Sequence, residues 1–191
     1  ALSDLLRSDA SVTQTGSGPP RPFVKEWKTA DLVQDLDLTR DQRSFERGRQ
    51  AFIDAQCILC HRLGDDGGAV GPELSGAASK YTVRDILESI LEPSKVLSDQ
   101  FQNSTFFLKN GDEVTGRVES ENDSRLVVVT DPLKSTRQEI RAADIQDRHA
   151  SKLSPMPEGL ANILTKEEIL DLLAYIQAGG KREAAIFTPR P

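Results

Sequence analysis

The sequence predicts a mainly α-helical fold with a small antiparallel β-sheet inserted before its last helix. Three segments, which start near residues 39, 82 and 165, combine helix-capping residues with an apolar face. Between the second and third, residues 101–152 read as short strands with turn residues between them. We therefore expect one domain at residues 39–180 with an inserted sheet at about 101–152, an N-terminal extension at 1–38 and a C-terminal tail at 181–191.

The first helix is expected to begin at Thr39. The residues Thr39 to Gln42 match a capping box, in which the Thr hydroxyl and the Gln side chain satisfy each other's free backbone amides. Phe45, Gly48 and Phe52 then share one face at helical spacing. Gly48 is costly inside a helix, so its expected use is to let another helix approach closely.

The other two helices carry the same kind of signal. One begins near Thr82, with Asp85 three residues later, and stops at Pro93. The last begins at Thr165, with Glu168 three residues later, and its run ends at two glycines. Their apolar stripes are Val83, Ile86, Leu87, Ile90 and Leu91 in one helix, and Ile169, Leu172, Leu173 and Ile176 in the other.

The inserted segment predicts a sheet of three or four strands. Asn110 and Gly111 supply the positive φ angles of a tight hairpin turn between residues 105–108 and 114–118. Residues 126–129 form a third apolar strand, and residues 136–141 a possible fourth. Two readings of this sheet stay open: a cover that shields a site in the helical part from water, or a docking surface for a partner.

The N-terminal residues predict an extension laid over the main body. The Pro- and Gly-rich stretch from Thr15 to Pro22 is irregular, and Trp27 follows it. Trp27 either covers an apolar patch of the domain or contacts a neighbouring domain. Residues 1–10 lack the basic start and apolar core of a secretory signal, so we expect a chain that was processed or cut from a longer polypeptide.

Composition excludes some partners. The formal net charge of −6 argues against nucleic acid, which needs clustered Lys and Arg. No apolar stretch is long enough to span a bilayer. The two cysteines, Cys57 and Cys60, lie in one run and offer no disulfide framework. Nothing in the sequence sets the oligomeric state.

That run, Cys57 to His61, has the spacing of a c-type haem attachment site. Cysteines at i and i+3 present two thiols on one helical turn, where they can form thioethers to haem, and the adjacent His can bind the iron. A structural zinc site needs four ligands, but only His149 remains elsewhere. A redox dithiol would lie between a strand and a helix, whereas this run follows a helix. We therefore expect one covalently bound haem c.

The chain resembles the class I cytochrome c family. The resemblance rests on Gly48, Phe52, the Cys57–His61 motif and three later segments, namely residues 71–74, 155–157 and 171–176. It implies that the first and last helices cross at a small residue and an aromatic, which suits Gly48, Phe52 and Tyr175. It also implies that the carbonyl of Pro72 accepts a hydrogen bond from His61 and that Leu74 packs against the haem face. The plain alternative is that Gly71-Pro72 is only a turn.

The resemblance further implies that Met156 is the sixth iron ligand. Met156 is the only methionine, and it lies between Pro155 and Pro157 on a stiff loop, a poor place for a core residue. His61 and Met156 together predict a comparatively high reduction potential. The rival ligand is His149, which lies among charged residues after the sheet and is more easily read as a solvated surface residue.

Residues 45–49 before the motif, residues 87–95 after it, the strands, and residues 156–160 together carry a closer resemblance. From about Trp27 to Gly180, the chain resembles the planctomycete/verrucomicrobial-type haem-binding domain. Members are often the C-terminal part of larger secreted or membrane-associated proteins with a dehydrogenase-like propeller. The resemblance implies an electron carrier, not an enzyme, that accepts electrons from a partner protein or a fused dehydrogenase domain and passes them to a respiratory carrier. It also implies a periplasmic or otherwise extracytoplasmic location.

Two other functions remain open at this point. A haem peroxidase needs a vacant sixth position and a distal acid or base. A gas sensor would let Met156 yield to a small ligand. Propionate contacts also stay open, with Arg62, Tyr81 and Arg84 as candidates that could equally be plain surface residues.

Overall fold

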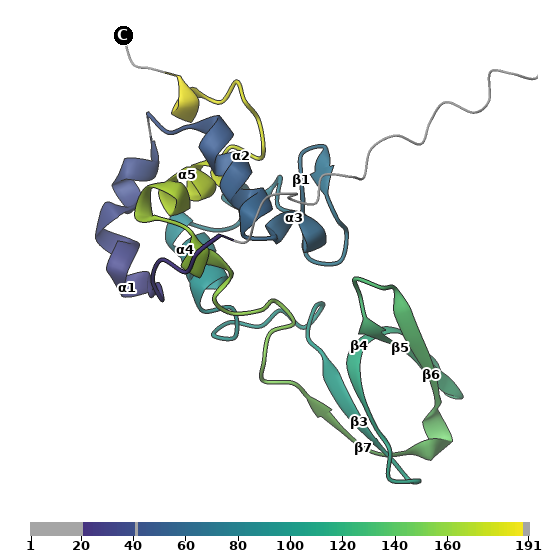
Figure 1. Ribbon diagram of the computed structural model, residues 1–191. Coiled ribbons are helices and arrows are strands. Elements are labelled where there is room, and N and C mark those ends of the chain that lie inside the picture. Colours follow the sequence, from purple (N-terminus) through teal and green to yellow (C-terminus); the bar gives the residue numbers. More distant parts are fainter. Residues whose placement is uncertain (1–20, 41, 189–191) are drawn as a thin grey trace, which may run out of the picture.

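The computed structural model describes residues 21–40 and 42–188, and it consists of a helical unit and a five-stranded β-sheet (Figure 1). Two linkers join them: the first linker is residues 92–103, and the second linker is residues 151–159. Helices account for 36% and strands for 22% of the structure, so the expected mainly α class is not clearly shown. The inserted sheet lies within the expected residues 101–152, but it has five strands instead of three or four.

Among residues 21–40 and 42–188, the helical unit contains five α-helices, of which three are longer than one turn. Short 3-10 helices and a two-stranded ribbon connect them. The α-helices are α1 (Thr29–Leu32), α2 (Phe45–Asp54), α3 (Cys57–Cys60), α4 (Val83–Leu91) and α5 (Lys166–Gln177). The 3-10 helices are η1 (Val33–Arg40), η2 (Ala77–Ser79), η4 (Leu160–Ile163) and η5 (Ala185–Phe187), and the ribbon pairs β1 (Arg62–Leu63) with β2 (Asp66–Gly67).

The predicted start of the first helix at Thr39 is wrong. Residues 33–40 form η1, and the buried Thr39 hydroxyl donates to the carbonyl of Leu36 instead of capping a helix. Gln42 has a left-handed φ of 54°, which turns the chain out of any helical path. The helix α2 begins later, where the Ser44 side chain accepts a hydrogen bond from the Arg47 amide.

The predicted starts of the other two helices are confirmed. Thr82 and Asp85 form a capping box at α4, and Thr165 and Glu168 form one at α5. Both apolar stripes face the core, with Val83 only partly buried. Gly179 and Gly180 have positive φ angles where the chain leaves α5.

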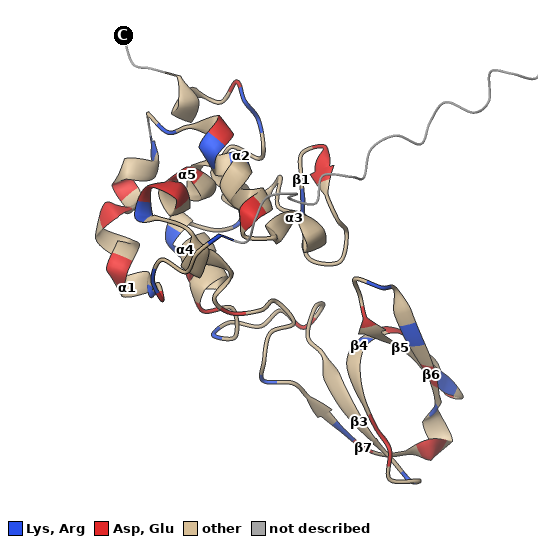
Figure 2. Cartoon of the chain, in the orientation of Figure 1, with Lys and Arg blue, Asp and Glu red and all other residues tan. Residues whose placement is uncertain are grey.

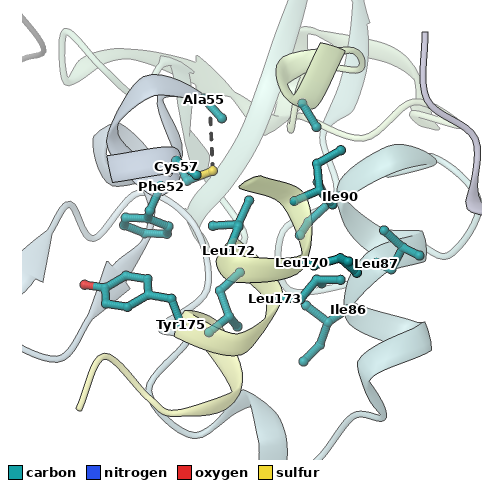
Figure 3. Packing of buried hydrophobic residues seen from close by; sticks show 14 of the residues in the cluster. Phe52, Ala55, Cys57, Ile86, Leu87, Ile90, Leu170, Leu172, Leu173 and Tyr175 are labelled. Carbon is teal, nitrogen blue, oxygen red and sulfur yellow. Dashed lines mark hydrogen bonds between the residues drawn. The ribbon is translucent and has the colours of Figure 1, made fainter. Parts of the chain in front are cut away.

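The crossing of α2 and α5 is the centre of the helical core (Figure 3). A Cβ on Gly48 would lie 2.4 Å from the carbonyl oxygen of Asp171, so only glycine fits there. Tyr175 stacks edge-on against Phe45 and Phe52 on the same side. In Figure 3, α5 lies between Phe52 on one side and the α4 residues Ile86 and Leu87 on the other. The predicted close approach at Gly48 is therefore present.

The N-terminal segment lies along the start of α5. Trp27 packs against the helical core, and its indole N–H donates to the carbonyl of Leu164 at 2.9 Å. Arg21 binds both Asp54 and Glu168. Trp27 thus covers an apolar patch of its own domain, which was the plainer of its two readings. Most of the Thr15–Pro22 stretch lies outside the described residues.

The sheet has five antiparallel strands in the order β6-β5-β4-β3-β7. The strands are β3 (Ser104–Leu108), β4 (Glu113–Glu121), β5 (Arg125–Asp131), β6 (Thr136–Arg141) and β7 (Ile145–Ala150), with the short η3 (Ala142–Asp144) before β7. The strand β7 was missed because residues after Ile145 are all exposed and show no apolar alternation, as is common in charged edge strands. His149 therefore lies in the sheet, not after it.

The β3–β4 hairpin turns at the predicted place by a slightly different geometry. Only Gly111 has a positive φ, of 92°, and its amide donates to the carbonyl of Leu108. This is a three-residue turn closed by a left-handed glycine, not a two-residue turn. The sheet buries a core of its own, which is separate from that of the helical unit and contains Phe106, Val114, Leu126, Val128 and Ile140.

Acidic and basic residues are interspersed over both units (Figure 2). Some ion pairs of the sheet reach across an intervening strand, such as Arg137 of β6 with Glu119 of β4 and Arg148 of β7 with Glu121 of β4. No helix within the described residues is long and apolar enough to cross a membrane.

Candidate haem site

The cysteine motif occupies the single turn of α3, directly after α2. Gln56 separates the two helices with a left-handed φ of 60°, an uncommon backbone conformation for a residue other than glycine. This residue redirects the chain so that α3 starts at an angle to α2, while the Leu59 amide bonds back to the Gln56 carbonyl. The turn thereby sets where both cysteines and His61 lie.

Both cysteines are free thiols on one helical turn. Cys57 is buried beside the helical core, where its thiol points to the carbonyl of Ala55 (Figure 3). Burial raises the pKa of the Cys57 thiol to about 12, and burial also raises the pKa of Cys60. A catalytic dithiol needs a lowered thiol pKa, so the raised values disfavour the redox-dithiol alternative.

His61 is oriented by the carbonyl of Pro72, at a distance of 2.8 Å from its Nδ1. Because a carbonyl can only accept, Nδ1 carries the proton and Nε2 keeps its lone pair. Burial lowers the pKa of His61, while the bond to Pro72 acts in the opposite direction. The imidazole is thus neutral near pH 7 and offers one free nitrogen, which is the form that a metal ligand takes.

The loop from β1 to Pro72 is shaped around His61. A Cβ on Gly71 would lie 2.8 Å from the imidazole Cε1, and one on Gly67 would lie 2.0 Å from the His61 carbonyl oxygen. Gly67 has a φ of 105°, which also favours glycine. The loop is tied to α2 by the ion pair of Arg49 with Asp66, at 2.8 Å. These contacts hold the histidine from two sides.

The family model of cytochrome c matches residues 45–112. The match begins at the first residue of α2, includes the Cys57–His61 motif, and ends in the turn before β4. It supports a cytochrome c family and a haem-containing electron-transfer protein. No curated protein shows a significant match to the chain. Met156 and α5 lie beyond the matched residues.

The residues of α3 and its loop fit a covalently bound haem c. Cys57 and Cys60 are unpaired thiols three residues apart, and His61 presents an unshared Nε2 directly after them. Leu74 is half-buried and packs against the helical core beside this segment. The three propionate candidates, Arg62, Tyr81 and Arg84, are all exposed. Within the described residues, no cluster of three or more His, Cys, Asp or Glu forms an alternative metal site.

The two candidate sixth ligands lie in different surroundings. Met156 is half-buried in the second linker, and its amide donates to the Ser154 hydroxyl at 3.1 Å. His149 is exposed on β7, where its Nε2 lies 2.8 Å from Asp147 and its ring contacts Phe107. The contacts of His149 stay inside the sheet, which agrees with its reading as a surface residue.

Two features of this site were not expected from the sequence. Gln56 carries no turn signal, since glutamine rarely adopts a left-handed conformation. The Arg49–Asp66 pair joins residues that are far enough apart in sequence to show no helical spacing. A signal did exist for the loop itself, because four of the eight residues between Leu63 and Pro72 are glycines.

Proposed function

We propose that this protein is a mono-haem c-type cytochrome that carries single electrons. Cys57 and Cys60 would attach the haem, His61 would bind the iron through Nε2, and Met156 would supply the second protein ligand to the iron. The domain that does this is residues 39–180. The observation that carries the proposal is the hydrogen bond from His61 Nδ1 to Pro72, because it leaves the imidazole with one free nitrogen beside two free thiols.

Each residue has a separate task in this proposal. Haem supplies one-electron iron chemistry when it is bound. Pro72 fixes the tautomer of His61 and makes the ring a better electron donor. Leu74 gives the haem an apolar neighbour, which keeps water away. The neutral sulfur of Met156 favours the reduced state, so we expect a comparatively high reduction potential.

The electrons are proposed to come from a dehydrogenase, either a separate protein or a fused domain, and to leave to a respiratory carrier. The support is the resemblance to haem-binding domains that end larger dehydrogenase-like proteins. Attachment of haem to such a motif implies an extracytoplasmic location, which we propose for this chain.

The test is the absorption spectrum of the ferric holoprotein at neutral pH. A sulfur ligand to ferric haem gives a weak far-red charge-transfer band, so the band is expected in the unaltered protein and lost in Met156→Ala. His149→Ala is the matched control and should keep the band. If the band is absent, or is unchanged in Met156→Ala, the ligation proposal fails, and fast cyanide binding would then favour a peroxidase or a gas sensor.

A further inference from the structure

The two linkers to the sheet are hydrogen-bonded to each other along their length. The Ser151 amide donates to the Asn103 carbonyl at 2.8 Å, and the Gln102 side chain donates to the Ser151 carbonyl at 2.9 Å. Closer to the helical unit, the Ser154 amide donates to the Ser94 hydroxyl at 3.2 Å. The second linker, which carries Met156, is thus held by the first.

A relay of two serine hydroxyls ends at Met156. Ser94 Oγ accepts from the Ser154 amide, and Ser154 Oγ accepts from the Met156 amide at 3.1 Å. Pro155 and Pro157 have no N–H, so Met156 carries the only backbone donor of this three-residue run. The relay therefore uses the one amide by which the loop around Met156 can be anchored.

The far end of the relay is rigid. Ser94 follows Pro93, which is buried at the end of α4. The helix α4 itself packs into the helical core through Ile86, Leu87 and Ile90. Ser94 thus connects the loop of Met156 to the end of a helix that belongs to the helical core, not to the sheet.

Apolar side chains flank the relay on both linkers. Val96 is 79% exposed and Leu153 is 69% exposed, although each is a large aliphatic residue. A haem bound here would remove the apolar surface of these two side chains from water. The two exposed aliphatic side chains and Met156 therefore lie on the same pair of linkers.

We propose that Ser94 is a positioning residue for the sulfur ligand, acting through Ser154 on the backbone of Met156. The inference rests on the proposed function and deepens it. Without the Ser94 hydroxyl, the loop loses its tie to α4, and Met156 should leave the iron more easily when an external ligand competes. A hydrogen bond of ordinary strength makes this an increase of about two- to ten-fold in apparent affinity for that ligand.

The experiment is a cyanide titration of the ferric holoprotein at neutral pH, read from its absorption spectrum. Ser94→Ala is expected to bind cyanide about two- to ten-fold more tightly while keeping the far-red band before cyanide is added. Ser94→Thr keeps a hydroxyl and should restore the original affinity. Ser89→Ala is the matched control, because its hydroxyl donates to the Asp85 carbonyl within α4 and takes no part in the relay.

The outcomes separate this inference from the proposed function. If Ser94→Ala binds cyanide like the unaltered protein while Met156→Ala loses the far-red band, the ligand stands and the positioning role is overturned. If Met156→Ala leaves the band unchanged, the sulfur ligation itself fails and the relay has nothing to position. A change of equal size in Ser89→Ala would also overturn the role, since it would reflect α4 stability alone.

Discussion

The backbone of Asp171 in α5 lies directly against Gly48 in α2. The side chain of the same aspartate is fully buried and accepts hydrogen bonds from the Ser44 amide at 3.0 Å and from Arg47 Nε at 2.6 Å. One residue therefore supplies both the surface that α2 crosses and the acceptor that holds the first turn of α2. Because only Ala55 and Gln56 separate α3 from α2, this contact also fixes where the cysteine motif starts.

We expect Gly48→Ala to lower the free energy of unfolding by about 1–3 kcal/mol. Alanine favours a helix over glycine by about 1 kcal/mol. Here the new methyl group would meet backbone atoms of Asp171 that cannot move aside, so the steric cost should win. Chemical denaturation of the holoprotein measures the change. Gly76→Ala, whose Cβ would have its nearest neighbour at 4.0 Å, is the control, and equal stability of the two variants would contradict the prediction.

The sequence predicted those parts of the fold that local chemistry decides. The capping boxes at Thr82 and Thr165 are correct because each pairs a hydroxyl with a carboxylate three residues later, directly before an apolar stripe. Gly48 was informative because glycine in a helix is costly unless a close approach requires it. The bond between His61 and Pro72 followed from the family resemblance.

Other parts depend on contacts that local patterns do not carry. Thr39 matches a capping box, but burial and its bond to Leu36 place it in a 3-10 helix instead. The strand β7 is charged and exposed, and it is defined only by its pairing with β3. The relay from Ser94 to Ser154 joins segments on either side of the whole sheet, so no window of sequence contains it.

The stability of α5 should depend on pH through Glu168. Burial alone would raise the pKa of Glu168, but hydrogen bonds from Thr165 and Arg21 outweigh it and hold the pKa below its ordinary value of 4.5. A lowered folded-state pKa gives stability that is fully present above pH 4.5 and is lost as the pH falls through the folded-state value. Glu168→Gln should therefore flatten the acid side of the stability curve.

Denaturant unfolding at several pH values between about pH 3 and pH 7 measures how the free energy of unfolding changes with pH, because carboxylates titrate in roughly this range. Glu167→Gln is the matched control, because Glu167 is its neighbour on α5 and is 59% exposed in its pair with Arg43. The expected result is a smaller loss of stability on acidification for Glu168→Gln than for Glu167→Gln. Parallel curves for the two variants would rule the role of Glu168 out.

The sheet should be able to unfold while the helical unit stays folded, since the two have separate cores. Phe106 is fully buried in the core of the sheet, and Phe106→Ala is expected to cost about 3–5 kcal/mol. Hydrogen exchange should then show faster exchange in β3 to β7 and unchanged protection in α2 and α5. Phe107→Ala, one residue along and 38% exposed, should change little. Loss of protection in α5 in the Phe106 variant would show that the two units unfold together.

The orientation of His61 should tune the reduction potential through Gly71. A methyl group on residue 71 would lie 2.8 Å from the imidazole Cε1, so Gly71→Ala should push the ring away and weaken its bond to Pro72. A ring without this bond donates less electron density to iron, which favours the reduced state. The potential should therefore rise, by on the order of tens of millivolts for a bond of ordinary strength. A redox titration of the holoprotein measures the shift, with Gly76→Ala as the control in the same loop region. A potential equal to that of the control would mean that Pro72 does not set the donor strength of His61.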